Sequence, residues 1–247
     1  MSKNPITPDK YDAVLFDLDG VITATAKLHA ACWKKMFDEY LEKRSKETGE
    51  PFKPFEIATD YKLYVDGKPR YDGVRDFIRS RGIELPEGTS EDSPQTKTVR
   101  GLGNRKNDLI NEVIDSVGVD AYEGTITLAR QIRDEGIKIA VVTSSQNCDV
   151  VLKAAKVEDL FEIRVDGNTI HEQHLSGKPA PDSYLEGAKR LGVDPRRTVV
   201  VEDAISGVQA GRNGKFGLVI GVDRKGNGDE LKKNGADIVV KDLGEFL

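Results

Sequence analysis

Two aspartates at the end of an apolar run are the first residues in this sequence whose type and spacing suggest chemistry. Asp17 and Asp19 stand one residue apart in VLFDLDGV, residues 14–21, with Gly20 directly behind them. Apolar residues followed by Asp and Gly indicate a buried strand that ends in a turn. Because ligands of open α/β sheets bind at the carboxyl ends of strands, the two carboxylates either serve a reaction or simply close the turn.

A calcium-binding loop is another interpretation of this pattern, but the spacing argues against it. In a calcium loop that began at Asp17, the third ligand would be Val21 and the closing acidic ligand would be Leu28. Neither side chain can bind a cation, so the DxDG pattern does not predict a calcium site.

Polar residues also follow other predicted strands and loops. They are Thr143, Ser144 and Ser145 after one strand, Lys178 in the loop SGKPAPD, and Glu202 with Asp203 after another strand. Each set alone is commonplace, since hydroxyl residues cap helices and charged residues usually face water. Together with Asp17 and Asp19 they make four polar sets on the same rim of one sheet, which indicates a site instead.

The residue types in these sets suit phosphoryl transfer. A carboxylate such as Asp17 can form an aspartyl phosphate, which divides a difficult displacement into two easier steps. The carboxylate and a phosphate dianion repel each other, so a divalent cation is needed, and Asp17, Glu202 and Asp203 offer the hard oxygen ligands that Mg²⁺ prefers. Asp19 is then available for proton transfer to and from the attacking or leaving oxygen.

Cationic and hydrogen-bonding groups would hold the phosphoryl oxygens as charge develops. The Thr143 hydroxyl, the Ser144 amide at a predicted helix start and the Lys178 ammonium are the residues suited to this role. Uncatalysed cleavage of phosphate monoesters is among the slowest reactions known, so several such groups are required.

The elements that position these residues alternate regularly after residue 120. We expect strands at 137–142, 161–165, 198–201, 218–222 and 238–240, in addition to the first strand. Helices are expected between them, at 126–135, 147–155, 183–191, 206–213 and 229–234. This order predicts an α/β fold with a Rossmann-like parallel sheet as its core.

Residues 24–119 show no strand alternation and are predicted to form an inserted α-helical domain. Trp33, Phe37, Tyr40 and Leu41 share one helical face, as do Leu109, Ile110, Val113, Ile114 and Val117. We therefore expect residues 1–23 and 120–247 to form the catalytic core and residues 24–119 to form a helical cap.

Composition excludes several classes of protein. The net charge of −5 argues against nucleic-acid and anionic-membrane partners. No apolar run approaches the length of a membrane span, and the first residues lack the apolar core of a signal peptide. Two distant cysteines, Cys32 and Cys148, fit a reducing compartment, so we expect a cytoplasmic protein, and we expect a monomer.

The four polar motifs, in this order along the chain, resemble those of the haloacid dehalogenase superfamily of aspartate-nucleophile phosphotransferases. The resemblance covers the core from end to end and implies a Rossmann-like core, Mg²⁺ as cofactor, and a cap inserted after the first motif. It also implies that Asp17 is the nucleophile, that Asp19 is the general acid and base, and that Thr143 and Lys178 are catalytic. The implied metal ligands are Asp17, Asp19, Glu202 and Asp203.

The residues around the first motif resemble those of the β-phosphoglucomutase branch of that superfamily. The stretch GVITATAKLHAACW carries Thr25 and His29 at positions that serve the active site there. In the cap, DGKPRYDGVRDF and RKNDLINEVI resemble stretches whose Arg70 and Lys106 bind the substrate. Ser144, Ser145 and Asn147 match substrate contacts as well. Ala24 departs from the pattern, because many of these enzymes have Asp there.

The resemblance implies a phosphomutase that interconverts β-glucose 1-phosphate and glucose 6-phosphate through an aspartyl phosphate and a 1,6-bisphosphate. A phosphatase acting on a sugar phosphate or a similar metabolite is the alternative, since water and a sugar hydroxyl use the same acid and base. A phosphate-binding receiver module is disfavoured by the order of the motifs. Receivers place their acidic pair early, whereas here the acidic pair Glu202 and Asp203 follows the threonine and the lysine.

Two other sites are disfavoured by spacing. His171 and His174 have no cysteine or further histidine nearby that would complete a zinc site, and Lys106 stands where a dinucleotide loop beginning at Gly101 would need glycine.

Overall fold

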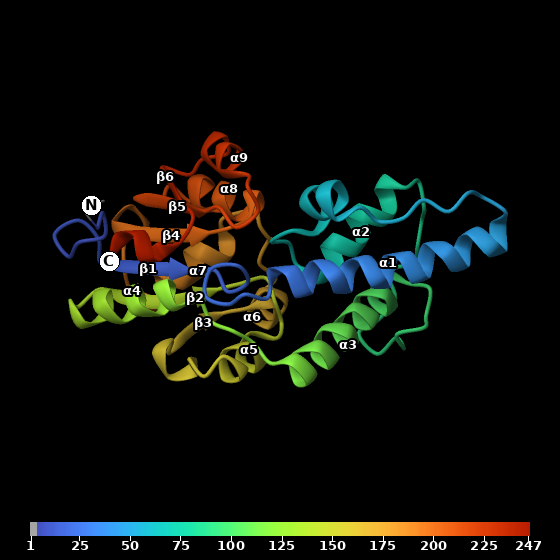
Figure 1. The fold of residues 1–247 in the computed structure, drawn as a ribbon, viewed down its shortest axis with the longest axis horizontal. Helices are drawn as coiled ribbons and strands as arrows, with labels where there is room; N and C mark the ends of the chain where they lie inside the picture. Colours follow the sequence, from blue (N-terminus) through green and yellow to red (C-terminus); the bar gives the residue numbers. More distant parts are fainter. Residues whose placement is uncertain (1–3) are drawn as a thin grey trace. The chain divides into compact units, whose positions relative to one another are not determined.

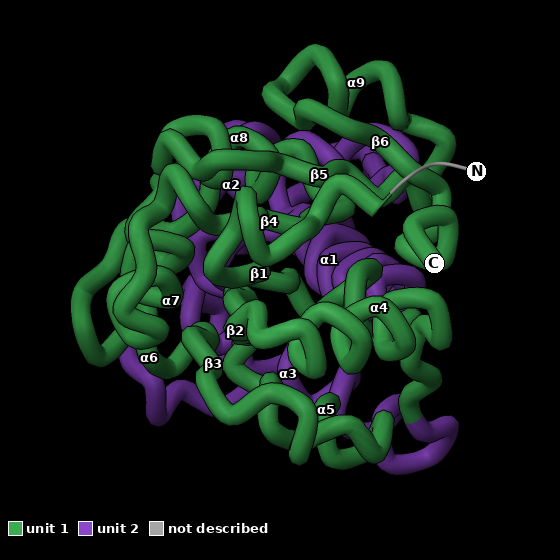
Figure 2. The backbone as a smooth tube through the Cα atoms, turned by 90° about the vertical axis from the view of Figure 1, so that its left-hand side faces the viewer, with its two compact units in different colours: residues 1–25, 119–247 green, residues 26–118 purple. Residues whose placement is uncertain are grey.

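The computed structural model describes residues 4–247, and two compact units can be distinguished within them. Residues 4–25 and 119–247 form one unit, called the core unit below, and residues 26–118 form the other, called the insertion. Figure 2 shows the two units in different colours. The chain changes units at 25/26 and at 118/119, where the sequence predicted changes at 23/24 and 119/120.

The core unit is built on a six-stranded sheet (Figure 1) in which every paired strand is parallel to its neighbour. The strands are β1 (Ala13–Phe16), β2 (Lys138–Val142), β3 (Ile163–Val165), β4 (Thr198–Glu202), β5 (Leu218–Val222) and β6 (Ile238–Val240). Their order across the sheet is β3-β2-β1-β4-β5-β6. This arrangement confirms the predicted α/β fold class.

In this unit one helix precedes β2, and helices follow each strand from β2 to β5; together they cover the sheet. They are α4 (Glu123–Asp134), α5 (Cys148–Ala154), α6 (Gly167–Glu172), α7 (Asp182–Leu191), α8 (Ile205–Asn213) and α9 (Gly228–Lys233). Figure 2 shows α7 and α8 on one side of the strands and α4 on the opposite side. Strands covered on both faces must be apolar throughout, and β1, β4 and β5 are buried along their whole length.

The strand order reverses beside β1, which is the position where ligands bind in such sheets. Phe16, the last residue of β1, pairs with Val141 of β2 on one side and Val201 of β4 on the other. The residues that follow these three strands therefore meet at one edge of the sheet.

The insertion is helical, with α1 (Ala26–Thr48), a π-helical segment η1 (Ile57–Val65), α2 (Arg70–Ser80) and α3 (Val99–Val117). Its core contains an aromatic cluster in which Phe37 lies 4.2 Å from Phe77 and 5.1 Å from Phe55 between ring centroids. The predicted apolar face of α1 is buried at Trp33, Phe37 and Leu41. Val117 was wrongly placed on a buried face: it ends α3 and is 75% exposed.

The two ends of the insertion leave the core unit side by side. The Ala24 N–H donates to the Asp120 carbonyl at 2.8 Å, and the Tyr122 N–H donates to the Ile22 carbonyl at 2.9 Å. The Thr125 hydroxyl adds a bond to the Val21 carbonyl at 2.7 Å. These bonds join residues 21–24 to residues 120–125, so the chain segments before and after the insertion are held together within the core unit.

Within residues 4–247, none of the helices combines the length and the hydropathy that crossing a bilayer would require.

Candidate active site

A buried ammonium group joins two of the predicted strand-end motifs. Lys178 Nζ lies 2.7 Å from Asp17 Oδ1 and 2.6 Å from Glu202 Oε1, and it donates to the Val142 carbonyl at 3.3 Å. The lysine side chain is fully buried. Although Lys178 is 161 residues from Asp17 in sequence, the sheet edge brings the ends of β1, β2 and β4 to the same ammonium.

Glu202 is held on all sides by donors from its own unit. Its Oε1 accepts from Lys178 and from the Tyr184 hydroxyl at 2.8 Å, and its Oε2 accepts the backbone N–H groups of Asp203 and Ala204. Gly207 in the first turn of α8 provides the space, because a Cβ there would lie 1.8 Å from Glu202 Oε1. The position of this carboxylate is therefore fixed by local structure.

Three carboxylates at this edge form a possible metal centre. One oxygen from each of Asp17, Glu202 and Asp203 lies within 4.8 Å of the others, and all three residues are buried. A set of carboxylate oxygens is the donor set that a hard divalent cation such as Mg²⁺ prefers. The residues thus fit the ion that the sequence suggested.

The Asp19 side chain lies outside this carboxylate cluster, so its predicted role as a metal ligand stays a prediction. Its Oδ1 accepts a short hydrogen bond from the Thr25 hydroxyl, whose oxygen is 2.9 Å from the Thr23 hydroxyl. The turn after Asp17 redirects the chain at Gly20, which has φ +91°, so the second aspartate joins the threonines instead of the metal cluster. The two carboxylates of the motif therefore have different hydrogen-bond partners, although the charge of Asp19 still helps to raise the pKa of Asp17.

The segment after β2 is a loop rather than the start of a helix. Thr143 is buried, and its hydroxyl accepts the Ser145 N–H at 3.1 Å. The Ser145 hydroxyl accepts the Asn147 N–H at 3.2 Å, and α5 begins only at Cys148. The prediction that Ser144 begins a helix is wrong, because side-chain bonds close turns over these residues first.

The environment changes the proton affinities of the central groups. Burial raises the pKa of Asp17 well above its ordinary value, and the Lys178 ammonium opposes this shift. Burial alone would lower the pKa of Lys178, but Asp17 and Glu202 raise it overall, so the lysine stays charged. Burial, with Glu202 second, raises the pKa of Tyr184 well above its usual value, so its hydroxyl keeps the proton that it donates.

In the insertion, two of the predicted substrate-binding residues contact each other. Lys106 Nζ lies 2.7 Å from His29 Nδ1 and 5.4 Å from the centre of the Trp33 ring, and both His29 and Lys106 are buried. An ammonium group has donors only, so His29 Nδ1 accepts and the ring proton of the neutral imidazole is on Nε2. His29 is thereby prepared to donate a hydrogen bond from Nε2.

Arg70, the third predicted substrate-binding residue of the insertion, begins α2 and is oriented by α3. Its Nη2 donates to Asn107 Oδ1 at 2.8 Å. Burial lowers the pKa of Arg70, but an arginine remains charged at any physiological pH. Asn107 was not predicted from the sequence, although it directly follows Lys106.

Three residues of the core unit that the sequence did not predict contact Glu202, Asp203 or the DLDG turn. Tyr184 binds Glu202, Lys225 lies 3.1 Å from Asp203, and Arg224 donates to the Gly20 carbonyl at 3.0 Å. Tyr184 follows the predicted lysine loop closely enough to have been considered. Arg224 and Lys225 lie beyond the four motifs, and nothing in their local sequence distinguishes them from surface residues.

Comparison with known proteins assigns the family. The model of the haloacid dehalogenase-like hydrolases matches residues 11–215. The chain belongs to this family. The resemblance inferred from the four strand-end motifs is therefore confirmed, and the haloacid dehalogenase-like core accounts for the position of the carboxylates at the strand ends.

Within the haloacid dehalogenase-like proteins, the chain is similar to β-phosphoglucomutases. It is 48% identical over 243 residues to the β-phosphoglucomutase of Mycobacterium bovis, covering 97% of this chain and 93% of that protein. The crystal structure of the Clostridium difficile β-phosphoglucomutase has the same fold, with a TM-score of 0.73, 24% identity, and coverage of 96% of this chain and 93% of that chain. A trehalose-phosphate phosphatase of Mycobacterium leprae is 39% identical over 139 residues, 54% of this chain and 30% of that protein.

Proposed function

We propose that the protein is a β-phosphoglucomutase that interconverts β-glucose 1-phosphate and glucose 6-phosphate. The observation that carries this proposal is the position of the Lys178 ammonium, which lies within hydrogen-bonding distance of both Asp17 and Glu202. Asp203 completes the carboxylate cluster. Similarity to a β-phosphoglucomutase over nearly the whole chain supports the same substrate.

In the proposed cycle, phosphorylated Asp17 gives its phosphoryl group to the 6-hydroxyl of β-glucose 1-phosphate. Asp19 accepts the proton of that hydroxyl, and Asp17 is released as a carboxylate. After the 1,6-bisphosphate reorients, Asp17 attacks the phosphorus at position 1 and the bond from phosphorus to the C1 oxygen breaks. Asp19 returns its proton to that oxygen, which leaves glucose 6-phosphate and phosphorylated Asp17.

The residues of the core unit have distinct parts in this scheme. Lys178 stabilises charge on the transferring phosphoryl oxygens, and Thr143 and Ser144 offer further donors beside it. Asp17, Glu202 and Asp203 would hold Mg²⁺. When bound, the ion would favour the charged form of Asp17, which burial disfavours, and would reduce its repulsion from phosphate. Thr25, which donates to Asp19, orients that carboxylate for proton transfer.

The insertion would supply sugar-phosphate recognition. Arg70 and Lys106 are cations suited to the phosphate that is not being transferred, and His29 is suited to donate to a sugar or phosphate oxygen. A mutase must keep water from its aspartyl phosphate, so these contacts would distinguish transfer to sugar from transfer to water.

One assay tests this function. The purified protein is incubated with Mg²⁺, β-glucose 1-phosphate and a trace of the 1,6-bisphosphate, and both glucose 6-phosphate and free phosphate are measured. Glucose 6-phosphate without free phosphate supports the mutase, whereas free phosphate alone supports a phosphatase. The phosphatase alternative is kept because the chain shares 39% identity over 139 residues with a trehalose-phosphate phosphatase.

A further inference from the structure

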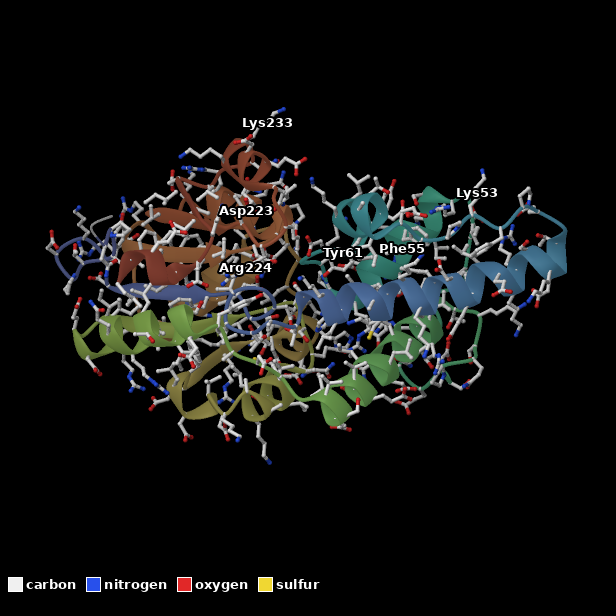
Figure 3. All side chains as sticks on the ribbon, viewed as in Figure 1. Lys53, Phe55, Tyr61, Asp223, Arg224 and Lys233 are labelled. Atoms are coloured by element: carbon white, nitrogen blue, oxygen red, sulfur yellow. The ribbon has the colours of Figure 1, made fainter. Side chains whose placement is uncertain are left out.

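The segment that connects β5 to α9 contributes an unassigned cation to the carboxylate cluster. This segment begins with Asp223 and Arg224, both labelled in Figure 3, and continues with Lys225. It follows a strand of the same parallel sheet, so it lies at the edge where the DLDG turn and the Glu202 loop also lie.

Arg224 anchors this segment firmly to the DLDG turn. Its Nε donates to the Gly20 carbonyl at 3.0 Å, and its Nη1 donates to the Lys241 carbonyl at 2.8 Å and to Asp242 Oδ2 at 2.9 Å. The guanidinium carbon lies 3.6 Å from the centre of the Tyr122 ring. These contacts fix the backbone of the residue that precedes Lys225.

The other side of the segment is fixed as well. The Asn227 N–H donates to Asp223 Oδ1 at 2.8 Å, and the Asp223 N–H donates to the Val240 carbonyl at 2.7 Å. Lys225 therefore projects from a short turn whose two ends are both hydrogen-bonded. The fold thus fixes the backbone from which the Lys225 side chain extends.

From this turn the Lys225 ammonium reaches a buried carboxylate. Lys225 Nζ lies 3.1 Å from Asp203 Oδ2, and the side chains are 29% and 3% exposed, respectively. Asp203 packs closely against the DLDG turn: a Cβ at Gly20 would lie 2.3 Å from Asp203 Oδ2, so only glycine leaves room for this carboxylate. The ammonium and the carboxylate are thus held close together by surrounding structure.

We propose that Lys225 is an internal counter-ion of Asp203 that sets the affinity of the carboxylate cluster for its divalent cation. Lys178 already compensates Asp17 and Glu202, so Lys225 is the group that compensates the third carboxylate. A cation that binds Asp203 meets the positive charge of Lys225, which lowers its affinity. In the cation-free protein the same charge relieves repulsion among three carboxylates within 4.8 Å.

The test compares the intact protein with its Lys225→Met and Lys233→Met variants. Lys233 lies on α9 and is exposed (Figure 3), so it serves as a matched loss of one surface charge. Isothermal titration gives the Mg²⁺ dissociation constant of each protein, and thermal unfolding is followed with EDTA and with saturating Mg²⁺. These readouts do not depend on turnover.

For Lys225→Met we expect the Mg²⁺ dissociation constant to fall about tenfold and the Tm in EDTA to fall by several degrees, with no Tm deficit at saturating Mg²⁺. Lys233→Met should match the intact protein in every measurement. Lys225→Arg keeps the charge and should keep the original dissociation constant.

An unchanged or weaker affinity in Lys225→Met would overturn the inference, and so would an arginine variant that binds as tightly as the methionine variant. The inference rests on the proposed function only in requiring that the cluster binds a divalent cation. If the intact protein bound no Mg²⁺, both the metal site and this inference would be refuted. If the intact protein and Lys225→Met bound Mg²⁺ with equal affinity, only the role proposed for Lys225 would be refuted.

Discussion

The Tyr184 hydroxyl donates to Glu202 Oε1 at 2.8 Å, on the same oxygen that lies 2.6 Å from Lys178 Nζ. Tyr184 is completely buried, and its ring centre is 4.9 Å from Nζ. The tyrosine therefore limits the positions that both the carboxylate and the ammonium can adopt. We therefore expect it to be a positioning residue that acts on the proposed reaction through Lys178.

Removing this hydroxyl should slow turnover without weakening substrate binding. For Tyr184→Phe we expect kcat to fall about tenfold, KM to stay within about twofold, and the free energy of unfolding to fall by about 1–3 kcal/mol. Steady-state kinetics and urea unfolding measure these effects. Tyr11→Phe, which removes a hydroxyl just before the start of β1, at the opposite end of that strand from Asp17, is the control. A larger change in KM than in kcat would contradict the assigned role.

Adding a methyl group at Gly207 should displace Glu202, since the new Cβ would lie 1.8 Å from Oε1. We expect Gly207→Ala to cost about 2 kcal/mol of stability or more, to weaken Mg²⁺ binding, and to lower kcat about a hundredfold.

Gly211→Ala is the control in the same helix. Its Cβ would lie 3.0 Å from a Val219 methyl, so it should destabilise the core but leave the Mg²⁺ affinity intact. If both variants bound Mg²⁺ equally well, the close approach at Gly207 would have no functional meaning.

Loss of the Arg70 guanidinium should affect sugar phosphates selectively. We expect Arg70→Ala to lower kcat/KM for β-glucose 1-phosphate about a hundredfold, and to change hydrolysis of a small aryl phosphate by less than about threefold.

Asn107→Leu should give a weaker form of the same pattern, because it removes the acceptor that orients Arg70. Arg79→Ala, an exposed arginine of α2, is the control. Equal losses on both substrates would argue against a phosphate contact at Arg70.

Both cysteine thiols should be inert in the folded protein. Cys32 and Cys148 are buried, and burial raises the pKa of each thiol, so little reactive thiolate forms near neutral pH. We expect slow reaction with a disulfide reagent such as DTNB in buffer and two equivalents in denaturant. Raising the pH from 7 to 9 should accelerate the reaction of the thiols with DTNB far more in the unfolded protein than in the folded one. Rapid native reaction of one equivalent would show that a thiol is accessible.

Most of the sheet could be predicted because each strand is a short apolar run between turn residues. The missed elements had weaker signals. Helix α6, Gly167–Glu172, is too short to show an apolar period, and η1 follows the period of a π-helix, which an α-helical pattern does not detect. Helix α4 begins at Glu123, three residues earlier than predicted, because its first turn is polar.

The central groups of the site were predictable for a similar reason. Asp17, Lys178, Glu202 and Asp203 follow strands or lie in a recognisable loop, so topology alone brings them together. The role of Asp19 as a metal ligand stays a prediction; the structure shows that its side chain accepts a hydrogen bond from Thr25 and lies outside the three-carboxylate cluster. Tyr184 and Lys225 were missed because their roles depend on side-chain distances to Glu202 and Asp203, which no sequence period encodes.

The paired backbone at Ala24 and Asp120 has an evolutionary consequence. Main-chain hydrogen bonds join the residues before and after the helical insertion. The length and composition of the insertion can therefore change in evolution while the junction keeps its shape. Selection can therefore retune which metabolite is accepted without redesigning the machinery that handles phosphorus.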